Sequence, residues 1–331
     1  MNHILLLGAG FSRNWGGQLA AEVFDYLIGL PEIRGDEYLR SILWRNKTFW
    51  GFENALAEVQ VAYIHNAQQH TDHLSRLQQG IARVLREMNE AFFEIPNFEF
   101  QQYQARMLRT FLVRFDAIFS LNQDILLDHH YLNDNIHLIA PRRWNGAQLP
   151  GMRRIPNREY LGAPSWGRDL WVPYDPSQFK IEDRFQPYFK LHGSSNWRDT
   201  EGGQLLVIGG EKSRAIQSHR VLAWYFEMFR ALIFRPNTKL MVIGYGFRDQ
   251  HINDIIIRAI NEYGLRMFVI DPLGSGLARA VNPTSNAAIF VRNALDEAFE
   301  RGLIGASVRR LNEIFGGDEV EHTKVRSFFD A

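Results

Sequence analysis

The strongest constraint on the fold is a series of short runs that are apolar at nearly every position, so that both faces of each run would be buried. The first run, residues 4–7, ends at Gly8. Such strands are typical of parallel sheets covered by helices on both faces. Further candidates are residues 117–121, 188–191, 205–208, 240–243, 267–270 and 288–291. Helical patterns at residues 223–234 and 252–263 separate some of them. This alternation predicts an α/β fold with a Rossmann-like, doubly wound, mostly parallel sheet.

A helical insertion is expected between the first two strands. From about residue 19 to residue 111, apolar residues recur at steps of three and four, with charged residues between them. Pro31 and Gly35 predict an early helix break, and Pro96 predicts the end of a long helix. We therefore expect a sheet domain formed by residues 1–30 and 111–331, with a helical insertion at residues 31–110.

Two later segments carry weaker patterns. Residues 141–187 are rich in Pro, Gly, Arg and Trp and show no sustained period, so an irregular loop insertion is expected there. This loop is a candidate lid, although aromatic packing alone would explain its composition equally well. Residues 295–315 predict two amphipathic helices.

Composition excludes several classes of protein. Lys and Arg together number 37, as do Asp and Glu, so the formal net charge is zero and no basic excess for direct nucleic-acid binding is present. The chain contains no cysteine, which removes disulfides, thiolate nucleophiles and Cys-ligated zinc. No apolar stretch is long enough to cross a bilayer, and the first residues do not resemble a signal peptide. We expect a soluble, cytoplasmic protein.

The first chemical motif follows the first strand and reads Gly8-Ala9-Gly10-Phe11-Ser12. Ligands of doubly wound sheets bind at the carboxyl ends of strands, and glycines allow the backbone to approach a pyrophosphate. The third glycine of the dinucleotide fingerprint is missing, because Arg13 stands in its place. Taken alone, the motif is equally consistent with a phosphate-binding loop and with a tight turn that binds no ligand.

Two more motifs lie at predicted strand ends. Asn122 and Asp124 follow residues 117–121, and His192-Gly193 follows residues 188–191. An asparagine can hold a ribose hydroxyl or orient a water molecule, and a histidine can act as a general base near neutral pH. In isolation, Asn122 and Asp124 are better explained by turn and cap chemistry, and His192 by a structural role.

Taken together and in this order, the three motifs resemble those of the sirtuin (Sir2-like) family, over residues 4–17 and 115–271. The resemblance implies that Asn122 is needed for attack on the nicotinamide ribose of NAD and that His192 is the general base. Asp124 would shape the site around Asn122 and contribute to cofactor binding. NAD would also be contacted by the loop after the first strand, namely Gly8, Ala9, Gly10, Phe11 and Ser12.

Two further segments extend the resemblance. Residues 242–249 contain Gly244 and Gly246 in a form that is similar to bacterial Sir2-like defence proteins, and these glycines would let the backbone approach the dinucleotide. Asp249 is expected to act as the N-cap of the following helix. Asp271, at the end of residues 267–270, would accept hydrogen bonds from the adenosine ribose.

The chain departs from deacylase sirtuins in two places. Those enzymes carry a zinc module built from four cysteines, and they have a Gly-Ile-Pro-Asp-Phe-Arg segment where this chain has Arg13-Asn14-Trp15-Gly16-Gly17-Gln18. We therefore expect no zinc or other metal site. His70 and His73 could share a helix face, but they lack a third ligand.

The resemblance implies an NAD hydrolase that releases nicotinamide and ADP-ribose, with NAD as substrate, in the antiphage-defence branch of the family. Such effectors deplete NAD and need restraint, which implies a homo-oligomer and a separate sensor or HerA-like ATPase subunit. Two alternatives stay open: an NAD-dependent protein deacylase or ADP-ribosyltransferase, and a non-enzymatic sensor of NAD or ADP-ribose.

Overall fold

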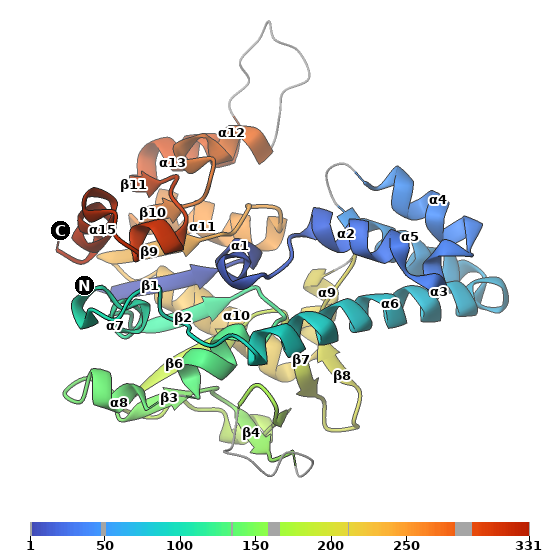
Figure 1. Cartoon of the computed structure of the whole chain (residues 1–331), viewed down its shortest axis with the longest axis horizontal. Helices are drawn as coiled ribbons and strands as arrows, with labels where there is room; N and C mark the ends of the chain where they lie inside the picture. The colour runs from blue at the N-terminus through green and yellow to red at the C-terminus, as the bar shows by residue number, and fades with distance from the viewer. Residues whose placement is uncertain are drawn as a thin grey trace, which may run out of the picture.

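The computed structural model describes residues 2–47, 51–133, 135–157, 166–210, 212–281 and 293–330. Within them a seven-stranded sheet has the order β11-β10-β9-β1-β2-β6-β3, and each pairing between neighbours is parallel (Figure 1). Helices flank the sheet, so the predicted Rossmann-like α/β class is confirmed. The strands of this sheet are β1 (Asn2–Leu7), β2 (Ala117–Ser120), β3 (Gly146–Gln148), β6 (Phe185–Lys190), β9 (Thr238–Ile243), β10 (Arg266–Ile270) and β11 (Leu303–Ser307).

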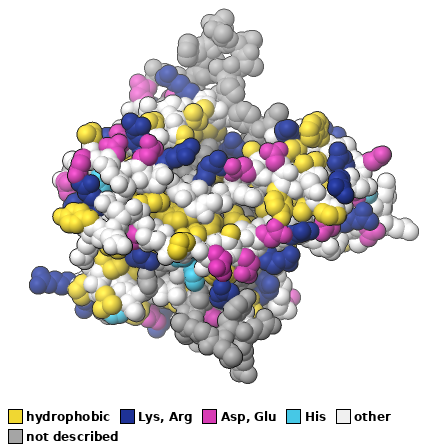
Figure 2. Space-filling view, in the orientation of Figure 1, with side chains coloured by type: hydrophobic (Ala, Val, Ile, Leu, Met, Phe, Trp, Pro, Cys, Tyr) yellow, Lys and Arg dark blue, Asp and Glu magenta, His cyan; other side chains and the backbone are white. Residues whose placement is uncertain are grey.

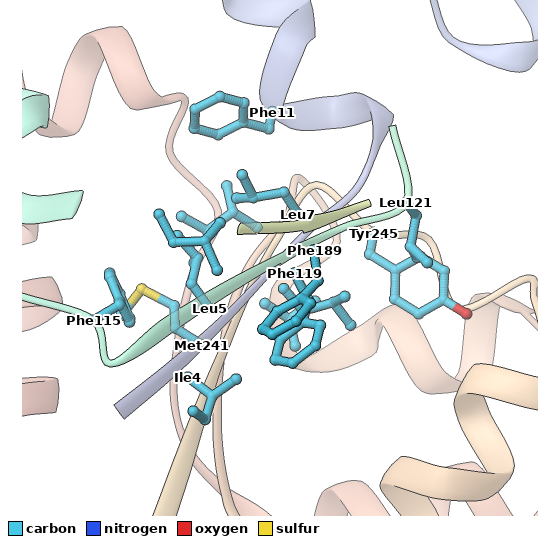
Figure 3. Packing of buried hydrophobic residues seen from close by; sticks show 14 of the residues in the cluster. Ile4, Leu5, Leu7, Phe11, Phe115, Phe119, Leu121, Phe189, Met241 and Tyr245 are labelled. Carbon is cyan, nitrogen blue, oxygen red and sulfur yellow. The ribbon is translucent and has the colours of Figure 1, made fainter. Parts of the chain in front are cut away.

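The central strands are buried on both faces, as their apolar sequences predict. Side chains alternate across the sheet, and Leu6 of β1 lies beside Phe119 of β2 in the register of the pairing. Figure 3 shows Phe11 on one side of the strands and the stacked rings of Phe119 and Phe189 on the other. On that second side, Phe229 packs at 4.9 Å from Phe119. Both layers of the core are therefore rich in aromatic rings.

Helices of the sheet region connect the strands and cover both faces (Figure 1). Those predicted at residues 223–234 and 252–263 are confirmed as α10 (Arg220–Ile233) and α11 (Gln250–Tyr263). The others are α1 (Ala9–Ser12), α7 (Leu108–Leu112), α8 (Ile136–Ile139), α9 (Lys212–Ser218), α12 (Leu277–Val281), α13 (Ala294–Gly302), α14 (Leu311–Ile314) and α15 (Glu319–Arg326). No helix in the described ranges is both long and apolar enough to span a membrane.

The predicted helical segment forms an arm that extends beyond the sheet (Figure 1). Pro31 begins a new helix and Pro96 follows the end of the longest one, as expected from the sequence. The arm has a hydrophobic core of its own, to which Phe24, Leu43 and Leu77 contribute. Figure 2 shows hydrophobic side chains gathered along the middle of this view. The arm consists of α2 (Ala20–Gly29), α3 (Pro31–Arg34), α4 (Glu37–Arg45), α5 (Gly51–His65) and α6 (Ala67–Phe93).

The prediction of a purely irregular loop at residues 141–187 is wrong. This region contains β3 at the edge of the main sheet, together with β4 (Met152–Ile155) and β5 (Leu170–Pro173). β4 and β5 join β7 (Gly193–Arg198) and β8 (Gln204–Leu206) in a second sheet of order β4-β5-β7-β8. Strands of three or four residues are too short to show a hydrophobic period, and β4 exposes three of its four residues. The strand predicted at 205–208 lies in this second sheet, as β8.

The prediction of two helices at residues 295–315 is also wrong in part. After α13 the chain forms the edge strand β11 before the short helix α14. β11 is mostly half-exposed, so it lacks the apolar character of a central strand. Its Gly305 lies against the ring of Phe268, where a Cβ atom would collide. The strand predicted at residues 288–291 lies outside the described residues.

Candidate active site

The predicted site residues directly follow strands of the main sheet, at the carboxyl ends of those strands. β1 lies between β9 and β2: the chain continues from β1 to β2 on one side, and later returns to place β9 on the other. The loops after these strands diverge at such a point, which is where doubly wound sheets bind ligands. Gly8–Ser12 follow β1, Asn122 and Asp124 follow β2, His192 follows β6 and Gly244 follows β9.

The loops after β1 and β9 touch through their backbones. The Gly10 amide donates a hydrogen bond of 2.9 Å to the Gly244 carbonyl. Gly244 has φ +65°, and a Cβ on it would collide with the backbone of Gly10. A Cβ on Gly8 would lie 2.6 Å from the Gly244 carbonyl oxygen. These glycines are therefore required by loop contact, whereas Gly246 has only the Arg248 side chain near its Cβ position, at 3.9 Å.

Some side chains of the first motif are exposed to solvent, and others are buried in the core. Ala9 is exposed at the start of α1, where the backbone is accessible. The ring of Phe11 is 1% exposed and packs at 5.2 Å from the ring of Trp15. Its side chain is therefore part of the core, so contact of Phe11 with a ligand would be limited to its backbone. Ser12 is also buried, but it points toward the loop after β2.

Ser12, Asn122 and Asp124 form one hydrogen-bonded cluster. The Ser12 hydroxyl donates to Asp124 Oδ2 at 2.8 Å and accepts from Asn122 Nδ2 at 3.0 Å. The other oxygen of Asp124 accepts from the Leu126 amide at 3.0 Å, so Asp124 also organises its own loop. Burial raises the pKa of Asp124, while the nearby Lys190 opposes that shift. The structure thus brings three predicted residues together.

Asn122 has one unsatisfied atom. The side chain is 7% exposed, and within the described part of the chain its Oδ1 atom is buried with no hydrogen-bond partner. An unpaired buried carbonyl costs on the order of 1–3 kcal/mol. Because Nδ2 is fixed by Ser12, Oδ1 is oriented and available to accept from a bound hydroxyl or water.

Lys190 was not among the predicted site residues. Its side chain is fully buried, with Nζ 3.0 Å from Asp128 Oδ2 and 2.6 Å from Ser194 Oγ. It also donates to the Asp124 carbonyl at 2.5 Å and so holds the loop that carries Asn122. A lysine at the end of an otherwise apolar strand, directly before Leu-His-Gly, was the available signal.

His192 lies beside the loop that carries Asn122. Beyond the paired ends of β2 and β6, the Leu191 amide donates to the Ser120 carbonyl at 2.9 Å. His192 is 2% exposed and is hydrogen-bonded to the backbone of Leu121, the neighbour of Asn122. Gly193 turns the chain at φ +72°, and a Cβ there would collide with the Leu205 carbonyl. The His-Gly pair therefore follows from the tight turn into β7.

The imidazole of His192 is a neutral group at pH 7. Burial lowers its pKa to about 3, with opposing contributions from Asp249 and Lys212. Its Nε2 atom is 3.2 Å from Nε2 of His251, a residue that sequence reasoning did not single out. A neutral imidazole has one unprotonated nitrogen, as a general base requires.

The expected cap role of Asp249 is wrong for its side chain. Asp249 occupies the N-cap position of α11, but no side-chain cap hydrogen bond forms. Instead its carboxylate pairs with Lys212 Nζ at 2.7 Å, and Lys212 also pairs with Glu53 of α5 at 2.7 Å. Burial opposes ionisation of Asp249, but His192 and Lys212 outweigh it and hold its pKa below the usual value. The amides of Ile252 and Asn253 donate instead to the backbone carbonyl of Asp249, each at 3.0 Å.

Asp271 lies at the carboxyl end of β10, at the same edge as the cluster but two strands from β1. Its Oδ1 accepts from the Leu273 amide at 2.9 Å, and burial raises its pKa. The described residues contain no group of three or more His, Asp or Glu side chains arranged to hold a metal ion. His70 and His73 do lie together, with their Nδ1 atoms 3.3 Å apart.

Comparison with protein-family models gives a match. The model of the SIR2-like domain family matches residues 157–291, about two fifths of the chain. No curated protein matches. The matched region contains His192, Gly244 and Asp271, whereas Ser12, Asn122 and Asp124 lie before it and reach the site through the fold. Residues 157–291 thus match a SIR2-like domain, which supports the resemblance to the Sir2-like family and points to an NAD-dependent enzyme family.

Proposed function

We propose that this chain hydrolyses NAD to nicotinamide and ADP-ribose at the cluster of Ser12, Asn122, Asp124 and His192. The observation that carries the proposal is the buried Oδ1 of Asn122, which has no hydrogen-bond partner among the described residues, on a side chain held by Ser12 beside the strand end that bears His192. The match to a SIR2-like domain supports NAD as the substrate.

The reaction needs an oriented ribose, a shielded water and a base. The nicotinamide–ribose bond breaks through an oxocarbenium-like state, as other glycosidic bonds do. Asn122 Oδ1 would accept a hydrogen bond from the attacking water or from a ribose hydroxyl. His192 would belong to the base that receives the proton of that water, while the bond electrons leave with nicotinamide. The glycine contact between the loops after β1 and β9 would lie near the phosphates, where close backbone approach matters.

Water is proposed as the acceptor because the chain lacks the parts of a deacylase site. It contains no cysteine, and the segment after Ser12 differs from that of deacylase sirtuins. Formation of O-acyl-ADP-ribose from an acylated peptide would instead assign the chain to the deacylases. Tight binding of ADP-ribose without turnover would favour the sensor alternative.

In the cell, we propose a role in antiphage defence in which NAD depletion stops the infected cell. A homo-oligomer and a separate sensor or HerA-like ATPase subunit would provide the restraint that a toxic activity needs. This role rests on the resemblance of residues 242–249 to bacterial Sir2-like defence proteins.

The test is release of nicotinamide from NAD by the purified chain. Asn122→Ala and His192→Ala should each lower the rate by at least about 100-fold, the usual range for a lost general base or orienting group. Asn261→Ala, an exposed asparagine of α11, serves as the control for handling and folding. Circular dichroism checks that each variant is folded. Turnover that survives both site substitutions would refute the assignment.

A further inference from the structure

The contact between His192 and His251 has no role in the function proposed so far. The two Nε2 atoms lie 3.2 Å apart, and the ring planes meet at 50°. His251 comes from the first turn of α11 and packs at 5.3 Å from the ring of Phe226. Two imidazole nitrogens at this distance share a proton, because one must donate to the other.

The surroundings define where the ring protons lie. His192 is hydrogen-bonded to the Leu121 backbone in a way that favours its protonated form, so the ring nitrogen there donates to the carbonyl. Since Nε2 faces His251, the donor is Nδ1, and Nε2 of neutral His192 carries the lone pair. Nε2–H of His251 then donates to it. Two neutral rings hold two protons, which leaves Nδ1 of His251 as the unprotonated nitrogen.

The charges beside the pair are arranged to accept one proton. Glu53 and Asp249 contribute two carboxylates, and Lys212 contributes one ammonium that pairs with both at 2.7 Å. The group therefore has a net charge of −1 while both histidines are neutral. Asp249 raises the pKa of both rings and Lys212 lowers it. Asp254 adds negative charge near His251 and also raises the pKa of that ring. One proton on the pair would bring Glu53, Asp249, Lys212 and the two rings to neutrality.

We propose that His192 and His251 act as one base, in which the proton of the attacking water enters at Nδ1 of His251 and the proton between the two Nε2 atoms is then shared with His192. This inference rests on the proposed NAD hydrolysis. It adds a residue of α11 to the machinery and gives the Glu53–Lys212–Asp249 group a task in the reaction.

The step balances as follows for one turnover. The water oxygen forms a bond to C1′ of the ribose, and the bond from C1′ to the nicotinamide nitrogen breaks with its electron pair going to nicotinamide. The water proton goes to Nδ1 of His251, so the imidazole pair then holds three ring protons: one on each Nδ1 and one between the two Nε2 atoms. Asp249 compensates the positive charge, and the proton leaves to solvent from half-buried His251.

Steady-state kinetics of the full chain provide the first test. His251→Ala should lower kcat about 10- to 100-fold with KM changed by less than about twofold, because the base is affected rather than binding. His251→Gln retains an N–H donor for His192 but cannot take up a proton, so it should recover only part of kcat. His65→Gln, on the exposed end of α5, is the control.

A second measurement separates this inference from the proposed function. In the ligand-free chain, histidine carbon resonances followed by NMR should show that the titration of each ring depends on the other. His251→Gln should shift the midpoint of His192, and Asp249→Asn should lower the pH at which the pair takes up a proton. Glu262→Gln, far along α11, should do neither. Independent titration of the two rings would overturn the inference even in an active enzyme, as would unchanged kcat in His251→Ala. A wild-type chain that releases no nicotinamide would instead contradict the proposed function.

Discussion

The hydroxyl of Ser12 donates a 2.8 Å hydrogen bond to the buried carboxylate of Asp124, and this contact joins the loop after β1 to the loop after β2. Ser12→Ala removes the donor and leaves Asp124 and the Asn122 amide without their shared partner. We expect a loss of about 1–3 kcal/mol in the free energy of unfolding and a fall in NAD turnover. Urea denaturation and nicotinamide release measure the two effects. Ser41→Ala, on the exposed face of α4, should change neither.

Gly244 tests the contact between the loops after β1 and β9. Gly244→Ala adds a Cβ that collides with the Gly10 backbone at a residue of positive φ. Gly264 also has positive φ, at +69°, but has open space around its Cβ position. Gly264→Ala should cost only the backbone strain, about 1 kcal/mol, and leave turnover intact. Gly244→Ala should cost more and reduce activity. Equal effects of the two substitutions on thermal unfolding and turnover would contradict this account.

Lys190 tests the buried ion pair beneath the site. Lys190→Met leaves the Asp128 carboxylate buried without its cation, and such changes destabilise proteins by about 3–5 kcal/mol. The double variant Lys190→Met with Asp128→Leu removes both charges and should recover much of that loss. Chemical denaturation of the wild type, the two single variants Lys190→Met and Asp128→Leu, and the double variant gives the coupling between the two residues. Additive losses would mean that the pair is not coupled.

Burial of His192 makes stability depend on pH. Its pKa is about 3 in the folded chain against an ordinary value of 6.5, so the unfolded chain binds the proton more readily. The free energy of unfolding is therefore unaffected by this group above pH 6.5 and should fall as the pH drops toward 3, by about 1.4 kcal/mol for each pH unit. Urea denaturation at pH 7, 5 and 4 measures the loss. His192→Gln should show a shallower fall, and an identical slope would count against the shift.

Asp271 bears on the choice between NAD and NADP. A carboxylate at the end of β10 would accept from the adenosine ribose hydroxyls and repel a 2′-phosphate. NADP should therefore be hydrolysed at least about tenfold less efficiently, measured as kcat/KM. Asp271→Asn should reduce the ratio of kcat/KM for NAD to kcat/KM for NADP, mainly by raising the value for NADP. An unchanged ratio would show that Asp271 does not contact the adenosine ribose.

The central strands and the order of the site motifs could be predicted from the sequence, because a strand buried on both faces is apolar at every position. Leu240 to Ile243 show this plainly. The edge strands β3 and β11 could not, since partly exposed residues such as Ile304 carry no such pattern. The same limit applies to β4, which has a single buried residue.

Within the site, residues adjacent to a recognisable motif were found and those contributed through space were not. Ser12, Asn122 and His192 stand in short motifs at strand ends. The neighbours Lys212 and His251 are placed by α9 and by the first turn of α11, and no local pattern links them to His192. Asp249 illustrates the difference. Its position in the sequence predicts a helix cap, but its carboxylate pairs with Lys212, which lies 37 residues earlier in the chain.

The central place of β1 has a consequence for how the protein is made. Ile4 pairs with Ala117 on one side and with Leu240 on the other. During synthesis β1 emerges before both of its partner strands, and its second edge stays open until β9 has been translated. Contacts this distant in sequence slow folding, and an open strand edge is prone to pair with other chains. The nascent chain therefore carries an exposed edge until β9 is made, and the Gly10–Gly244 contact becomes possible only after that.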